Sequence, residues 1–198
     1  MPKLLVLSDL DRTLFDTARF FDNIWEFASR TYGFDVEQER ARAPEFFRYT
    51  GDLYDYRFFE HLRSSAGAAY DEADFIAKAQ AKLGGTYLYD DITPEAIRLI
   101  DAIVTFGGEE YQSFKLSLCP ELDGIDRHIV LQSKGEYIHD TFDRPSVLID
   151  DKHLENEILP PATFIWIDRS TVAEGTLSDG YTIRSFDDLP AVLERIAH

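Results

Sequence analysis

The feature that most constrains this chain is a short apolar run near its N-terminus that ends in two carboxylates one residue apart. Residues 4–7 are all Leu or Val, and Asp9 and Asp11 come just after them. In an extended chain the side chains at i and i+2 point to the same side, and ligands bind at the C-terminal ends of parallel strands. Because paired carboxylates repel each other unless a hard cation such as Mg²⁺ neutralises them, the sequence predicts a metal-dependent site here.

An alternative is that Asp9 and Asp11 only cap the helix that follows, since Asp is a favoured N-cap residue. The metal site is preferred because other largely apolar runs also end in polar groups. Three runs share this pattern: residues 102–104 end at Thr105 and Gly107-Gly108, residues 128–131 end just before Lys134, and residues 145–149 end at Asp150-Asp151. Strands that alternate with helical segments predict an α/β fold with a doubly wound, mostly parallel sheet.

The order of these motifs resembles that of the haloacid dehalogenase-like (HAD) hydrolase superfamily, over residues 3–15 and 90–198. Residues 9–13 are similar to the first motif of the family, Asp-x-Asp-x-Thr. Thr105, Lys134 and the Asp150-Asp151 pair are similar to its second, third and fourth motifs. Arg12 departs from the pattern, because many phosphatases of the family carry Gly there. The resemblance implies a Rossmann-like core.

The resemblance also implies the chemistry. Asp9 would attack phosphorus and form an aspartyl-phosphate. Asp11 would protonate the leaving alkoxide and then deprotonate the water that cleaves the intermediate. Dehalogenases of the family do not need this second Asp, because a halide leaves without a proton, so Asp11 favours a phosphatase. A phosphomutase of the same subfamily would share every motif and stays open as an alternative.

The remaining site residues would bind the phosphoryl group or the metal. Phosphate binding is expected from Thr105, the backbone at Phe106 and Gly107, and Lys134. The resemblance implies that Mg²⁺ is held by the Asp9 carboxylate, the Asp11 backbone carbonyl and Asp150, with Asp151 in support. Lys115 is an alternative phosphate-binding lysine. It falls within an amphipathic pattern in which Tyr111, Phe114 and Leu118 share one helical face, which favours a solvated role for Lys115. Lys134 is preferred because it comes just past a strand and 16 residues before Asp150.

The segment between the first and second strands is too long for one crossover. Residues 16–89 show helical spacing and no hairpin signal, which predicts an all-helical insertion in a core made of residues 1–15 and 90–198. Within the HAD superfamily this insertion resembles the C1 type of cap. A cap that closes over the site would exclude water. It would also make large folded proteins poor substrates, so the expected substrate is a small phosphorylated metabolite.

Composition limits the other classes of function. The formal net charge of −17 argues against a nucleic-acid or anionic-membrane surface. The single cysteine, Cys119, excludes an internal disulfide. The first apolar run is too short to be a signal peptide or membrane span, which predicts a cytoplasmic protein. The oligomeric state stays open.

Two other classes share part of this pattern. A response-regulator receiver domain also gathers acidic residues, Thr and Lys around Mg²⁺, but in a different order along the chain and without a large insertion. A non-catalytic interaction protein could retain the fold, although each catalytic position of the family is occupied here. The sequence therefore favours a Mg²⁺-dependent phosphatase.

Overall fold

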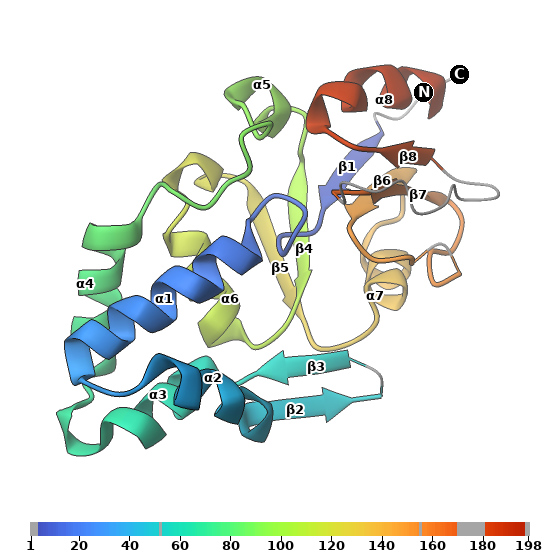
Figure 1. The fold of residues 1–198 in the computed structure, drawn as a ribbon. Helices are drawn as coiled ribbons and strands as arrows, with labels where there is room; N and C mark the ends of the chain where they lie inside the picture. Colours follow the sequence, from blue (N-terminus) through green and yellow to red (C-terminus); the bar gives the residue numbers. More distant parts are fainter. Residues whose placement is uncertain (1–3, 52, 155, 170–180, 197–198) are drawn as a thin grey trace. The chain divides into compact units, whose positions relative to one another are not determined.

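The computed structural model describes residues 4–51, 53–154, 156–169 and 181–196. The chain forms two compact units (Figure 1). The sheet unit comprises Met1–Asp16, Leu88–Phe106 and Glu121–His198, and the insert unit comprises Thr17–Tyr87 and Gly107–Pro120. The insert unit therefore includes residues 107–120, which the sequence analysis assigned to the core.

The sheet unit contains a six-stranded parallel sheet in the order β5-β4-β1-β6-β7-β8. Its strands are β1 (Leu5–Ser8), β4 (Ala102–Phe106), β5 (Asp126–Val130), β6 (Ser146–Asp150), β7 (Ala162–Ile167) and β8 (Tyr181–Ile183). Its helices are α5 (Pro94–Ile97), α7 (Lys134–Thr141) and α8 (Leu189–Ile196). The predicted doubly wound, Rossmann-like α/β fold is confirmed.

The central strands are buried on both faces, as expected for a parallel sheet covered by helices. Every residue of β1 and β6 is buried. These two strands pair in register, with Leu7 beside Leu148 and Ser8 beside Ile149. Strand β4 lies on the other side of β1, where Ser8 pairs with Ile103. The ends of β4, β1 and β6 are therefore neighbours, and each leads into a residue that the sequence analysis singled out.

The insert unit is mainly helical. Its helices are α1 (Thr17–Tyr32), α2 (Val36–Arg42), α3 (Phe58–Ala66), α4 (Glu72–Leu83) and α6 (Glu109–Ser117). Helix α1 turns one face inward and buries Phe20, Ile24, Trp25 and Ala28 completely. Aromatic rings fill much of this core: Phe58, for example, packs against Tyr111 with ring centroids 5.1 Å apart. Helix α6 thus contributes apolar side chains to the insert unit.

A two-stranded antiparallel hairpin interrupts the helices of the insert unit. Strands β2 (Phe47–Thr50) and β3 (Leu53–Tyr56) pair with Phe47 opposite Tyr56 and Tyr49 opposite Tyr54. The prediction of an all-helical segment without strands is therefore wrong. Aromatic residues alternate along both strands and favour strand pairing; the Phe47 and Tyr54 rings stack with centroids 4.5 Å apart. At the turn, Gly51 has a φ of +59°, which glycine adopts without strain.

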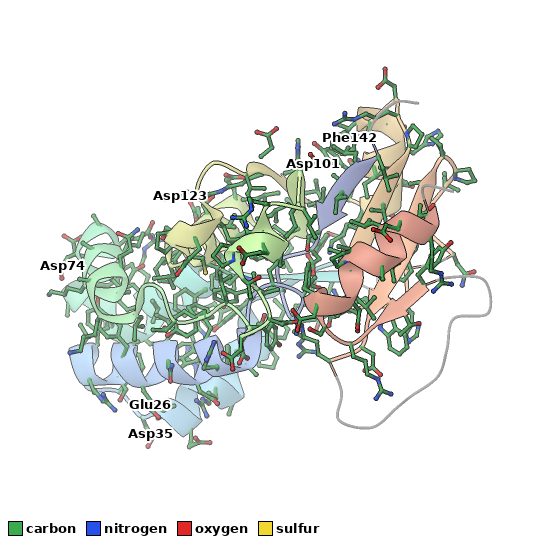
Figure 2. All side chains as sticks on the ribbon, turned by 90° about the horizontal axis from the view of Figure 1, so that it is seen from above. Glu26, Asp35, Asp74, Asp101, Asp123 and Phe142 are labelled. Atoms are coloured by element: carbon green, nitrogen blue, oxygen red, sulfur yellow. The ribbon has the colours of Figure 1, made fainter. Side chains whose placement is uncertain are left out.

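Most of the negative charge lies at the surface, as Glu26, Asp35, Asp74 and Asp123 illustrate (Figure 2). Few carboxylates are buried among the described residues: Asp9, Glu39, Asp55, Asp150 and Asp168. Burying a carboxylate is costly unless it is paired, so each of these needs a local explanation. In the described part of the chain, no helix is both long enough and apolar enough to cross a membrane.

Candidate active site at the strand ends

The candidate site lies at the C-terminal ends of three neighbouring strands. Asp9 directly follows β1, and its backbone N–H donates to the Ile149 carbonyl of β6 at 2.8 Å. Asp150 is the last residue of β6, and Thr105 is the penultimate residue of β4. The hydrogen bonds of the parallel ladder therefore place these side chains at one edge of the sheet, where α/β proteins bind ligands.

Lys134 joins two of the carboxylates. It is the first residue of α7, after β5, and its Nζ lies 2.6 Å from Asp9 Oδ1 and 2.6 Å from Asp150 Oδ2. All three side chains are at least nine-tenths buried. The second Asp150 oxygen accepts the backbone N–H of Lys152 at 2.8 Å. Lys134, the lysine preferred from the sequence, thus contacts both Asp9 and Asp150.

Asp151 completes a group of three carboxylates. One oxygen each from Asp9, Asp150 and Asp151 lies within 4.8 Å of the others. When all three are ionised, their negative charge exceeds that of the Lys134 ammonium, which contacts Asp9 and Asp150, and a divalent cation would offset the excess. The donor set consists of oxygen atoms alone, which suits a hard cation. The residues present therefore fit a magnesium-type site.

The electrostatics of this group also favour an added cation. Burial is the largest influence on Asp9 and raises its pKa to about 7, with Asp150 and Asp11 adding to the rise and Lys134 opposing it. Burial and the Asp150 charge raise the pKa of Asp151 to about 6. The two carboxylates raise the pKa of Lys134 despite its burial. Ionised carboxylates are therefore crowded here, and a positive charge would relieve that crowding.

Thr105 offers a donor that the described residues do not use. Its side chain is 1% exposed, and Oγ1 has no hydrogen-bond partner in the described part of the chain. Buried hydroxyls usually have a partner, so this one is suited to an anionic ligand. Phe106 ends the same strand. Gly107 begins the part of the insert unit that contains α6, and a Cβ on it would overlap the Gln112 side chain.

Asp11 lies on a tight turn after β1. Residues 10–15 fold back so that the N–H of Phe15 donates to the Leu10 carbonyl at 2.9 Å and that of Arg12 donates to the Phe15 carbonyl at 2.8 Å. Arg12 has a φ of +58°, the left-handed conformation that glycine adopts freely. For a residue with a Cβ this costs about 1–2 kcal/mol. Glycine at this position would avoid that cost.

Other residues support the site, although the sequence analysis did not name them. Trp166 donates its indole N–H to the Asp151 carbonyl at 3.0 Å. A Cβ on Gly135 would overlap the Glu157 backbone carbonyl. The absence of a Cβ at Gly135 therefore allows the first turn of α7, which carries Lys134, to pack against the Glu157 backbone. A glycine directly after the predicted lysine was a signal for this role, whereas nothing local to Trp166 pointed to Asp151.

Lys115 lies on α6 in the insert unit. Its side chain is 2% exposed, and Nζ lies 4.7 Å from the centre of the Tyr111 ring. The predicted solvated role for Lys115 is therefore wrong. The helical face that was expected to be apolar is buried, with Tyr111, Phe114 and Leu118 inside. The spacing identified that face correctly but did not show that Lys115 is buried as well.

Comparison with known proteins gives matches at the level of structure. No protein-family model and no curated protein matches the sequence. A haloacid dehalogenase-like hydrolase from Burkholderia xenovorans is similar in structure, with a TM-score of 0.68, 17% identity and 99% of each chain covered. A HAD phosphatase from Thermococcus onnurineus has a TM-score of 0.61 and 20% identity, over 96% of this chain and 98% of its own.

Two further matches are a magnesium-bound hydrolase and a dehalogenase. The HAD hydrolase YfnB from Bacillus subtilis, in a magnesium-bound structure, has a TM-score of 0.59 and 17% identity, over 98% of this chain and 99% of its own. An L-2-haloacid dehalogenase from Xanthobacter autotrophicus has a TM-score of 0.58 and 15% identity, over 97% and 98%. These likenesses show that the chain has the fold of the HAD hydrolases.

Proposed function

We propose that this protein is a Mg²⁺-dependent HAD hydrolase that cleaves small phosphate monoesters through an aspartyl-phosphate intermediate. The observation that carries the proposal is the buried group of Asp9, Lys134 and Asp150. It lies at the ends of neighbouring strands, one of which carries the Thr105 hydroxyl, a group without a partner among the described residues. It combines a carboxylate nucleophile, a cationic side chain and a hydrogen-bond donor. A phosphate ester needs these groups, because its negative charge repels an attacking carboxylate.

In the proposed first step, a carboxylate oxygen of Asp9 forms a bond to phosphorus while the ester P–O bond breaks. Asp11 gives its proton to the leaving oxygen. In the second step, Asp11 takes a proton from a water molecule whose oxygen attacks the same phosphorus. The bond between Asp9 and phosphorus breaks, and inorganic phosphate is released. Dividing the displacement in this way makes each step easier than a direct attack by water.

Phosphoryl oxygens would be bound by the Thr105 hydroxyl, by backbone N–H groups near Phe106 and Gly107, and by Lys134. The carboxylates of Asp9, Asp150 and Asp151, with the Asp11 backbone carbonyl, would hold Mg²⁺. A bound Mg²⁺ would supply positive charge that offsets the repulsion between the carboxylates and the phosphate.

The proposed substrate is a small phosphorylated metabolite. The insert unit departs from the sheet unit at Asp16 and rejoins it at Leu88. These connections begin beside the turn that follows Asp9 and Asp11, since Phe15 pairs with Leu88 in an antiparallel bridge. We propose that the insert unit acts as a cap of the C1 type and selects the substrate, which would exclude large folded proteins.

The proposal is tested by measuring phosphate release from a panel of phosphorylated sugars, nucleotides and organic acids. We expect hydrolysis with Mg²⁺ and none in excess EDTA or with Asp9→Asn. L-2-chloropropionate serves as the dehalogenase substrate in the same experiment. Chloride release without any phosphate release would contradict the proposal and assign a dehalogenase. Conversion of one phosphate isomer into another without net release would assign a phosphomutase.

A further inference from the structure

Arg169 binds the backbone of the loop that carries Asp9 and Asp11. It comes two residues after β7, and its Nε and Nη2 donate to the Thr13 carbonyl oxygen at 3.0 and 2.6 Å. Two parallel N–H groups on one planar guanidinium make this contact directional, and lysine cannot reproduce it. The contact links positions 156 residues apart in the sequence, so it ties the loop after β1 to the end of β7.

Other groups of the sheet unit hold this guanidinium in place. Nη1 lies 3.1 and 3.2 Å from the two carboxylate oxygens of Asp91. The ring of Tyr89 lies 3.9 Å from the guanidinium carbon, which is close enough for a cation–π contact. Asp91 also accepts the backbone N–H of Phe186 at 2.8 Å. The Arg169 and Asp91 side chains are only 15% and 14% exposed, so solvent screens this pair weakly.

The loop that Arg169 contacts needs external support. Arg12 has a positive φ, which is unfavourable for a residue with a Cβ. The Thr13 hydroxyl is buried and has no hydrogen-bond partner among the described residues, so the side chain does not anchor the loop through its hydroxyl. The carbonyl of Thr13 is instead the acceptor for two guanidinium N–H groups. Strained backbone persists when the surrounding structure fixes it.

We propose that Arg169 is a positioning residue for the Asp9–Thr13 loop and keeps Asp11 in place for proton transfer. Asp91 and Tyr89 fix the guanidinium, the guanidinium fixes the Thr13 carbonyl, and Asp11 is two residues from that carbonyl. The positioning role stands on the contacts alone. Its effect on proton transfer rests on the proposed function.

Hydrogen exchange tests the positioning role without a substrate. In Arg169→Lys we expect the amides of Arg12 and Phe15, which are hydrogen-bonded within the turn, to exchange about tenfold faster or more. Arg127→Lys is the matched control, because Arg127 also pairs with an aspartate, Asp123, and donates to a backbone carbonyl in the sheet unit. It should leave exchange in residues 10–15 unchanged. Unchanged exchange in a folded Arg169→Lys protein would overturn the positioning role.

Leaving-group dependence tests the link to Asp11. With Mg²⁺ present, Arg169→Lys should lower kcat for an alkyl phosphate about tenfold more than for p-nitrophenyl phosphate, because only the poor leaving group needs the proton. A residue that only stabilises the fold would lower both rates equally, and that result would overturn the link. Arg127→Lys should leave the ratio unchanged.

A second variant covers the case in which Arg169→Lys does not fold. Asp91→Asn keeps Arg169 and the size of its partner but removes the charge that holds the guanidinium, so it should change exchange and leaving-group dependence in the same direction. If the wild-type protein hydrolyses no phosphate ester, the proposed function fails. The exchange measurement still decides the positioning role in that case.

Discussion

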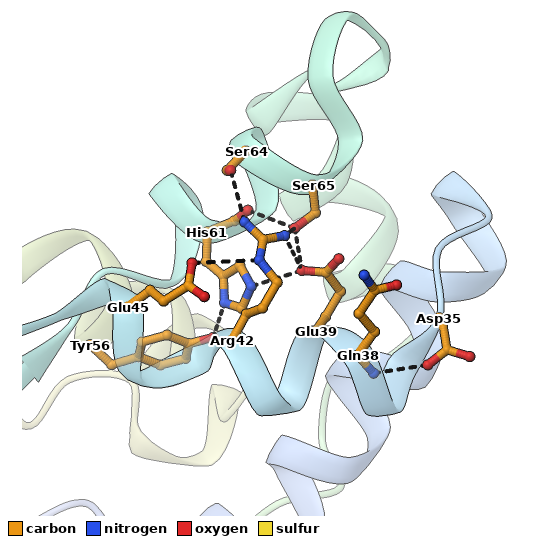
Figure 3. Close-up of polar contacts among 9 residues, drawn as sticks. All are labelled: Asp35, Gln38, Glu39, Arg42, Glu45, Tyr56, His61, Ser64 and Ser65. Carbon is orange, nitrogen blue, oxygen red and sulfur yellow. Dashed lines mark hydrogen bonds and ion pairs between the residues drawn. The ribbon is translucent and has the colours of Figure 1, made fainter.

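Buried charge occurs in both units, but it is balanced differently in each. In the insert unit, the Glu39 carboxylate accepts a hydrogen bond from the Ser65 hydroxyl at 2.6 Å and lies 2.8 Å from Arg42 Nη1 and 2.9 Å from His61 Nε2 (Figure 3). The other ring nitrogen of His61 lies 2.8 Å from the Tyr56 hydroxyl. Burial opposes ionisation of Glu39, yet these partners together lower its pKa.

The sheet unit has the opposite balance. Asp9 and Asp150 share one buried ammonium, that of Lys134, and a carboxylate oxygen of Asp151 lies within 4.8 Å of theirs. Burial and mutual repulsion raise the pKa of Asp9 and Asp151 instead of lowering it. One carboxylate with several donors makes a network that holds helices and strands together. Several carboxylates with one cationic side chain make a cluster that is unfavourable for folding but suited to a cation and a phosphate, so charge balance separates the two clusters.

Asp9→Asn should produce the largest effect on activity, and it should change activity and stability in opposite directions. We expect phosphate release to fall about 10⁴-fold or more, because an amide is a poor nucleophile. Stability without divalent cations should rise by about 1 kcal/mol, because one of the crowded charges is removed. Phosphate assays and thermal unfolding in EDTA measure the two effects. Near-native turnover of any phosphate ester by this variant would contradict the assignment of the nucleophile.

Asp11→Asn should have a smaller effect that depends on the substrate. Loss of general acid–base catalysis lowers the rate about 10²–10⁴-fold. Affinity for Mg²⁺, measured by calorimetry, should change little because the proposed ligand is the backbone carbonyl. The first-step rate should recover partly with good leaving groups in this variant but not in Asp9→Asn. Equal losses on good and poor leaving groups would argue against Asp11 as the acid.

Glu39→Ala should lower stability without removing the site. Breaking a buried charged pair costs about 3 kcal/mol, which for a chain of this size lowers Tm by roughly 6–12 °C. The control is Glu26→Ala, whose pair with Arg30 is exposed at 56% and 79%. That variant should change the free energy of unfolding by less than about 0.5 kcal/mol. Equal effects of the two variants in urea unfolding would show that the buried network adds nothing.

The smallest predicted effect is a pH dependence in the insert unit. Burial is the main cause that lowers the pKa of His61, and Glu39 offsets it only in part. The folded protein therefore favours neutral His61, and this stabilisation is present above the unfolded value of 6.5 and lost as pH falls through the lower folded pKa. His61→Gln should remove that loss. Urea unfolding between pH 7 and 5, followed by fluorescence of Trp25, whose ring lies 4.7 Å from His61, would detect the difference.

Local patterns explain what the sequence predicted well. The parallel sheet could be predicted from apolar runs such as residues 4–7, because such a run indicates a buried strand wherever it lies in the sheet. The grouping of the polar residues after these runs could be predicted too, because the C-terminal ends of parallel strands lie at one edge of the sheet. The hairpin at residues 47–56 was missed because its aromatic residues also fit a helical spacing. Pairs such as Glu39 with His61 and Arg169 with Thr13 were missed because their positions depend on the tertiary fold.

The division of the insert unit between two stretches of sequence limits how the protein can be dissected. The chain leaves the sheet unit after Asp16 and returns at Leu88, and the bridge between Phe15 and Leu88 brings those ends together. A short linker could therefore span the gap left by excising residues 17–87. Helix α6 would then lose the aromatic partners that cover Phe114, among them Phe58. The insert unit can thus be separated at its chain connections but not in its packing, and a protein trimmed to the sheet unit would need a redesigned α6.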